Sequence, residues 1–114
     1  MKAKLVIHPV DDLDACVRFY ADTLKLAVKF RDGDRYCAID AGGITLALVA
    51  GEERLVDVPA LGYACESLDA LHAAIDAATA SGATVTRALE KGPHEWRAVL
   101  KDPAGMPFVV SAKL

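Results

Sequence analysis

Hydrophobic positions along the first half of the chain change from an extended to a helical period and back again. The β-branched and apolar residues at 5–10 predict a strand, and Asp11 and Asp12 follow it as possible helix N-caps. The next segment carries one apolar stripe at helical spacing: Leu13, Cys16, Val17, Tyr20 and Leu24. The pattern predicts a strand followed by a helix that ends before Leu26.

Three strands are expected after this helix. The segments 27–31, 35–41 and 44–49 read as strands, separated by the turn signals Asp32-Gly33 and Gly42-Gly43. The first half therefore reads strand, helix, strand, strand, strand.

The second half repeats this order of elements after a segment that shows no hydrophobic periodicity. Residues 51–59 carry mixed charges and are expected to form a linker. A strand at 61–66 and a helix that starts at Ser67 or Asp69 and stops at Gly82 follow. Three more strands are expected at 84–90, 95–101 and 107–112.

The repeat predicts the domain organisation. Leu13-Asp14-Ala15 recurs as Leu68-Asp69-Ala70, and both triplets open a helix. We expect one domain over 1–114, built from a module at 1–50, the linker at 51–59 and a module at 60–114. A ferredoxin-like fold is the alternative, but three strands after each helix count against it.

Composition narrows the class of protein. The chain has 114 residues, is 54% hydrophobic and carries a net charge of −3 without a basic block, so a nucleic-acid partner is not expected. No apolar run is long enough to span a membrane, and the first residues lack a signal-peptide pattern. An odd number of cysteines, Cys16, Cys37 and Cys65, is no disulfide framework, so a cytoplasmic location is expected.

Two motifs carry a family resemblance. Val10-Asp11-Asp12-Leu13, followed by Phe19-Tyr20 and Leu24, resembles the entry motif of the vicinal-oxygen-chelate superfamily, which contains glyoxalases, bleomycin-resistance proteins and extradiol dioxygenases. Lys25 stands where that motif usually has glycine. Asp102-Pro103-Ala104-Gly105 resembles the family's Asp-Pro-Asp-Gly turn before the last strand.

The resemblance implies an α+β fold in which two βαβββ modules form a cupped mixed sheet. One face of each sheet packs on a helix, and we expect Leu46, Leu48, Phe108 and Val110 on that face. The other face holds the ligand, and we expect it to carry Thr45, Ala47, Pro107 and Val109. A homodimer is also implied by the resemblance.

The resemblance further implies one divalent ion held by His and Glu side chains from four strands. Counted from the motifs, those positions are Leu5, Ala47, Tyr63 and Val109. Three of them have no donor atom, and tyrosine is a rare ligand, so no metal and no cofactor are expected. A different register, with His8 as a ligand, is the alternative.

The expected site is therefore a small-molecule pocket whose lining we predict as Leu5, Ala47, Tyr63, Trp96, Arg97, Val99 and Val109. Arg97 is expected to bind a carboxylate or phenolate, and Tyr63 and Trp96 to contact a planar ring. The first hypothesis is a metal-independent protein that sequesters a planar or aromatic compound. The second is a metal-dependent lyase, isomerase or dioxygenase, and the third is a regulatory module with an empty cup. No catalytic residue is identified.

Overall fold

The computed structural model describes residues Met1–Leu114 and contains two compact units. The N-terminal unit is Leu5–Pro59, and the C-terminal unit is Ala60–Leu114 together with Met1–Lys4. The segment expected as a linker belongs to the N-terminal unit and begins with a short 3₁₀ turn, η2 (Gly51–Glu53).

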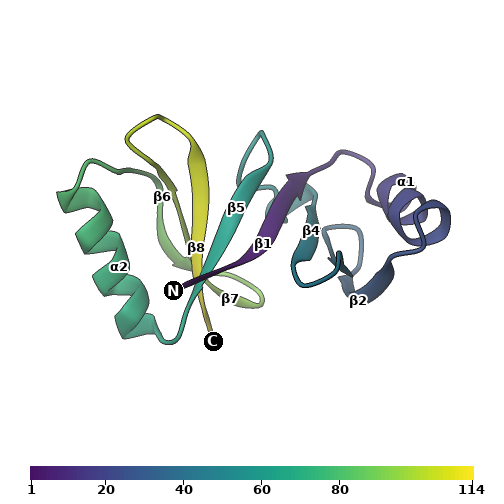
Figure 1. Cartoon of the computed structure of the whole chain (residues 1–114), viewed down its shortest axis with the longest axis horizontal. Helices are drawn as coiled ribbons and strands as arrows, with labels where there is room; N and C mark the ends of the chain where they lie inside the picture. Colours follow the sequence, from purple (N-terminus) through teal and green to yellow (C-terminus); the bar gives the residue numbers. More distant parts are fainter. The chain divides into compact units, whose positions relative to one another are not determined.

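The N-terminal unit holds four strands in the order β2-β3-β4-β1. Strand β1 runs parallel to β4, and the other neighbours are antiparallel. Helix α1 and the π-helix η1 connect β1 to β2 (Figure 1). The bounds are β1 (Lys2–Pro9), α1 (Leu13–Val17), η1 (Arg18–Thr23), β2 (Ala27–Asp32), β3 (Tyr36–Asp40) and β4 (Thr45–Val49). The first residues of β1, up to Lys4, belong to the C-terminal unit.

The C-terminal unit repeats this arrangement in the order β6-β7-β8-β5, with β5 parallel to β8 and the other neighbours antiparallel. Its bounds are β5 (Ala60–Cys65), α2 (Leu68–Ala80), β6 (Thr84–Lys91), β7 (Glu95–Lys101) and β8 (Pro107–Lys113). The predicted α+β class and the βαβββ repeat are confirmed, and the ferredoxin-like alternative is wrong because three strands follow each helix.

Both helices begin at predicted caps. The Asp12 carboxylate accepts a hydrogen bond from the Ala15 amide at 3.0 Å, and the Ser67 hydroxyl accepts one from the Ala70 amide at 3.0 Å. Each side chain satisfies an amide that has no partner inside the helix. The longer helix, α2, has 13 residues, and neither helix has the length and apolar character of a membrane span.

Each unit has its own core between one sheet face and its helix. Leu13 packs with Ile39 and Leu48 in the N-terminal unit, and Leu71 of α2 packs with Leu100 and Val110 in the C-terminal unit. Figure 1 shows α2 beside the strands that it covers. The residues predicted to face the helices are confirmed by these clusters: Leu46, Leu48, Phe108 and Val110.

The first helix differs from its predicted form. The stripe from Leu13 to Leu24 predicts one α-helix, but the chain changes to a π-helix at Arg18, and the Leu24 amide donates to the Phe19 carbonyl at 3.0 Å. Lys25 then adopts a positive φ of 61°, the only non-glycine residue that does so. Lysine therefore occupies the left-handed position that a glycine fills in the family motif.

Replacing Lys25 by glycine is expected to stabilise the chain. A β-carbon in the left-handed region costs about 1 kcal/mol, and glycine removes most of that cost. Urea unfolding of Lys25→Gly should therefore show a higher midpoint than the parent chain. Lys101→Gly, in strand β7, is the matched control and should lower the midpoint. A lower midpoint for Lys25→Gly would contradict this account of the turn.

Candidate functional site

The face of the C-terminal sheet opposite α2 holds three of the predicted site residues. Val99 pairs with Val109 across β7 and β8, and Arg97 pairs with Ser111. Because Ala98, Leu100 and Val110 face α2, their neighbours along the strands face away from it. Arg97, Val99 and Val109 are thus brought together as predicted, and all three are buried.

Arg97 is held by groups of the β6–β7 hairpin. Its Nε lies 3.4 Å from Glu90 Oε1, and Nη1 lies 3.8 Å from Glu95 Oε1. A hydrogen bond from Arg87 lowers the pKa of Glu90 below its usual value, and the charges of Arg87 and Arg97 act in the same direction. The guanidinium is therefore a buried cation with two carboxylates beside it.

Gly92 provides the space for this guanidinium. A β-carbon built on Gly92 would lie 2.9 Å from Arg97 Cζ, although the Gly92 backbone needs no positive φ. Gly92→Ala is therefore expected to displace Arg97 and to lower stability by about 1–2 kcal/mol in urea unfolding. The same substitution in an Arg97→Met background should cost less, because the rigid guanidinium is gone. Equal costs in both backgrounds would show that the contact is unimportant.

Tyr63 and Trp96 lie on the α2 side of the sheet. Tyr63 pairs with Val110, packs against the core under α2 and places its ring edge-on to Phe108 at 5.9 Å. Trp96 packs against the same core, with Lys91 Nζ 6.0 Å from its ring centre. The expectation that Tyr63 faces the cup is therefore wrong, and the ligand contact expected of Trp96 stays a prediction. Counting from the motifs misplaced β5 by one residue, and a one-residue slip moves a side chain to the opposite face.

The N-terminal unit places Leu5 and Ala47 on its face opposite α1. Leu5 pairs with Thr45, and Ala47 pairs with Ile7. Ala47 has no exposed surface, and Leu5 is half-buried. These two predicted positions therefore have the expected orientation.

His8 does not reach that face. It pairs with Leu48, which belongs to the core under α1, and its ring lies edge-on to Tyr20 with the centroids 6.3 Å apart. Its Nδ1 is buried and has no hydrogen-bond partner. The alternative register with His8 as a metal ligand is wrong, because the strand directs this side chain toward the helix.

Sequence reasoning missed Lys29. The pairing of β2 with β3 is irregular between Val28 and Phe30, so Lys29 sits at a bulge. Its ammonium group donates a hydrogen bond to Thr45 Oγ1 at 2.9 Å. A bulge re-aims a side chain without leaving a periodic signal, so no pattern in the sequence could have placed this cation beside Thr45.

The side chains at the family's metal positions do not fit a divalent ion. Leu5, Ala47 and Val109 offer no donor atom, and Tyr63 faces α2. Within each unit, no group of three or more His, Cys, Asp or Glu side chains is placed to hold a metal. The buried thiols are not alternatives: burial raises the pKa of Cys37, and Cys65 lies in the core under α2.

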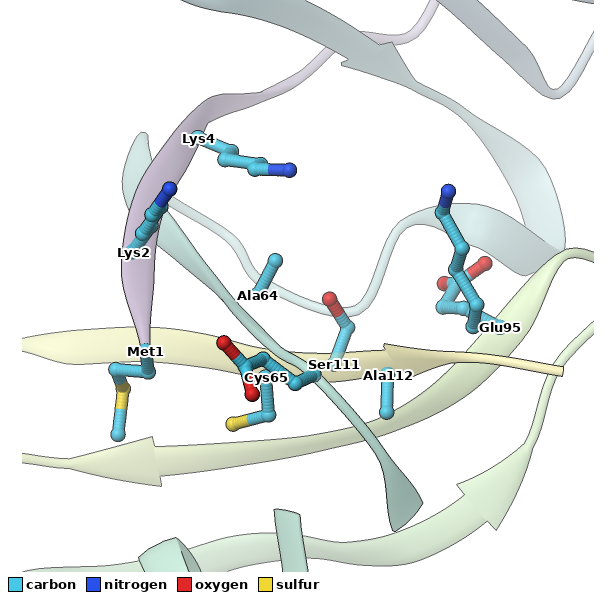
Figure 2. A pocket seen from close by; sticks show the side chains of 10 residues that line it. Met1, Lys2, Lys4, Ala64, Cys65, Glu95, Ser111 and Ala112 are labelled. Atoms are coloured by element: carbon cyan, nitrogen blue, oxygen red, sulfur yellow. The ribbon is translucent and has the colours of Figure 1, made fainter. Parts of the chain in front are cut away.

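An open cavity of about 430 Å³ lies in the C-terminal unit where β5 and β8 end and β7 begins. Figure 2 shows Lys4 extending above Ala64, with Lys2 beside it on the same strand and the Ser111 hydroxyl pointing toward the same space. The remaining lining residues are Met1, Cys65, Glu66, Glu95, Ala112 and Lys113. Ser111 and Glu95 continue the face that holds Arg97. The sequence did not predict this cavity, because residues near both ends of the chain form it.

Comparisons with known proteins identify the family to which this chain belongs. A model of the Glyoxalase-like domain matches residues 4–111. An uncharacterized protein of Mycolicibacterium smegmatis is 35% identical over 117 residues, covering 99% of this chain and 95% of its own length.

Solved structures share the fold at low identity. NAD-dependent benzaldehyde dehydrogenase from Legionella pneumophila has a TM-score of 0.82 at 15% identity, covering 96% of this chain and 98% of that one. A glyoxalase/bleomycin resistance protein/dioxygenase superfamily member from Vibrio splendidus 12B01 has a TM-score of 0.68 at 17% identity, with 96% and 97% covered. This chain therefore belongs to the Glyoxalase-like domain family, within the vicinal-oxygen-chelate superfamily.

Proposed function

We propose that this chain binds a small organic molecule without a metal ion. One observation carries the proposal: the strand positions that hold metal in the superfamily carry Leu5, Ala47 and Val109, which have no donor atoms. A divalent ion needs several nitrogen or oxygen donors. Binding energy must therefore come from apolar contact, hydrogen bonds and fixed charges.

The open cavity of the C-terminal unit is the place we assign to this ligand. Its volume of about 430 Å³ lies within the range of small-molecule sites. The predicted contacts Arg97, Val99 and Val109 are buried and do not line this cavity, so their contact with a ligand stays a prediction. A planar or aromatic ligand, as the sequence suggests, would have to reach these residues through the cavity.

Two further parts of the proposal concern the state of the protein. We assign it to the cytoplasm, since Cys16, Cys37 and Cys65 are all free. We also propose a homodimer, as the family resemblance implies. Analytical ultracentrifugation at several concentrations tests this point, and a monomer at all of them would contradict it.

Ligand binding in the presence of a chelator tests the proposed function. Trp96 lies on the α2 side of the sheet, but its chain neighbour Glu95 and its strand partner Ala112 both line the cavity, so its fluorescence should report an occupied cavity. We expect hits from a library of small aromatic and carboxylated compounds to bind equally well with EDTA and with added Mn²⁺, Ni²⁺, Zn²⁺ or Fe²⁺. Binding that needs the metal would overturn the proposal and favour the alternative, a metal-dependent lyase, isomerase or dioxygenase.

A further inference from the structure

We infer that the cavity of the C-terminal unit binds the anionic part of its ligand, a group with two or more negative charges such as a phosphate ester or neighbouring carboxylates. This inference rests on the proposed function for the place of binding and adds the chemical class of the ligand.

Three lysines surround the cavity from two elements. Lys2 and Lys4 come from β1, and Lys113 comes from the last residue of β8. Lys113 is far from the other two in the sequence, and the fold brings all three to the lining of one cavity. Figure 2 shows Lys2 and Lys4 on their strand at the edge of this cavity. Three cations around one concave surface concentrate positive potential there.

None of these ammonium groups forms an ion pair. In this unit Arg87 pairs with Glu90, and Arg97 pairs with Glu90 and Glu95, whereas no ion pair joins Lys2, Lys4 or Lys113 to a carboxylate. The lysine charges are therefore available to a ligand. Unpaired ammonium groups also repel one another, and a bound anion would relieve that repulsion.

Two carboxylates line the same cavity, and they do not cancel the positive charge. Glu95 lies 3.8 Å from Arg97, so its charge is shared with that guanidinium. Glu66 is the other acidic residue of the lining and is exposed. The three lysines of the lining therefore face two carboxylates, and one of these, Glu95, already lies beside a guanidinium. A singly charged ligand would compete poorly with these carboxylates, whereas a multivalent anion can contact several lysines at once.

Ser111 supplies a neutral hydrogen-bonding group on the floor of the cavity. Its hydroxyl lies 3.5 Å from the Tyr63 carbonyl, a long hydrogen bond that a ligand oxygen could replace. Ala64, its neighbour across β5 and β8, has a small side chain and leaves the floor open. The arrangement of one hydroxyl beneath several ammonium groups suits an oxyanion.

Titration of the ¹⁵N-labelled chain with inorganic pyrophosphate and with citrate, both in EDTA and 50 mM salt, tests the inference. We expect saturable shifts of the amides at 64–66 and 111–113, with dissociation constants below about 1 mM. Raising the salt to 500 mM should weaken binding about tenfold or more. A preference for pyrophosphate would identify phosphate as the source of the charge, and a preference for citrate would identify carboxylates.

Matched variants connect the shifts to the cavity. Lys4→Gln with Lys113→Gln should weaken pyrophosphate binding about tenfold or more, and Ser111→Ala should weaken it a few-fold. Lys101→Gln, at the opposite end of β7, should change it less than about twofold. The exposed lysine variants should keep the parent melting temperature.

The outcomes separate this inference from the proposed function. Equal losses in the Lys101→Gln control and in the double variant, or no shifts at 111–113, would overturn the anion site. If neutral aromatic compounds still bound in EDTA, the proposed metal-free binding would stand even though the anion site had been overturned. Anion binding that appeared only after metal was added would instead overturn both.

Discussion

Replacing Arg97 by alanine is expected to destabilise the chain by about 3 kcal/mol, because the change removes a buried cation and leaves its carboxylate partners without it. Only 7% of the Arg97 side chain is exposed, and it lies beside Glu90 and Glu95. It also fills the space over Gly92, so alanine would leave a void in the hairpin. Urea unfolding at pH 7 measures the loss directly.

Arg87 is the matched control for this prediction. It pairs with the same carboxylate, Glu90, but its side chain is 45% exposed. Arg87→Ala should therefore cost less than about 1 kcal/mol. Similar losses for both variants would mean that burial of Arg97 contributes nothing, and that the hairpin does not depend on this cation.

The second large effect is expected at Ala47, where the superfamily places a metal ligand on the fourth strand. Ala47 has no exposed surface and pairs with Ile7 and Ala38. Glutamate there would bury a charge in a tightly packed position, so Ala47→Glu should lower the free energy of unfolding by at least about 3 kcal/mol. Ala41→Glu, at an exposed position directly after β3, should change it by less than about 0.5 kcal/mol.

Added metal gives this experiment a second readout. Thermal unfolding of Ala47→Glu is measured with EDTA and then with Mn²⁺, Ni²⁺ or Zn²⁺. We expect no recovery, because Leu5, on the neighbouring strand, offers no second donor. A large metal-dependent rise in the melting temperature would show a latent metal site at this position and would contradict the packing argument.

The repeat made most of the fold predictable from the sequence. Two helical patterns, each followed by three strands, predicted the order of elements and the α+β class. They begin at Leu13-Asp14-Ala15 and at Leu68-Asp69-Ala70. The helix-facing residues followed from alternation, as Leu48 and Val110 show. The π-helix at Arg18–Thr23 was not predictable, because its apolar stripe also fits an α-helix.

The site was harder to predict, for three physical reasons. The face of Tyr63 depends on a register that changes completely with a slip of one residue. Lys29 reaches Thr45 through a bulge that has no periodic signal. The cavity of the C-terminal unit is lined by residues from near both ends of the chain, and only folding brings Lys4 and Lys113 to the same surface.

The metal content of the purified protein shows whether its site works without an ion. The untagged protein is purified without chelator, equilibrated with Mn²⁺, Ni²⁺, Zn²⁺ and Fe²⁺ in turn, desalted and analysed for bound metal per chain. We expect close to zero of each ion, since Leu5, Ala47 and Val109 cannot coordinate one. About one ion per chain, retained through desalting, would contradict it and would make metal-assisted chemistry the function to pursue.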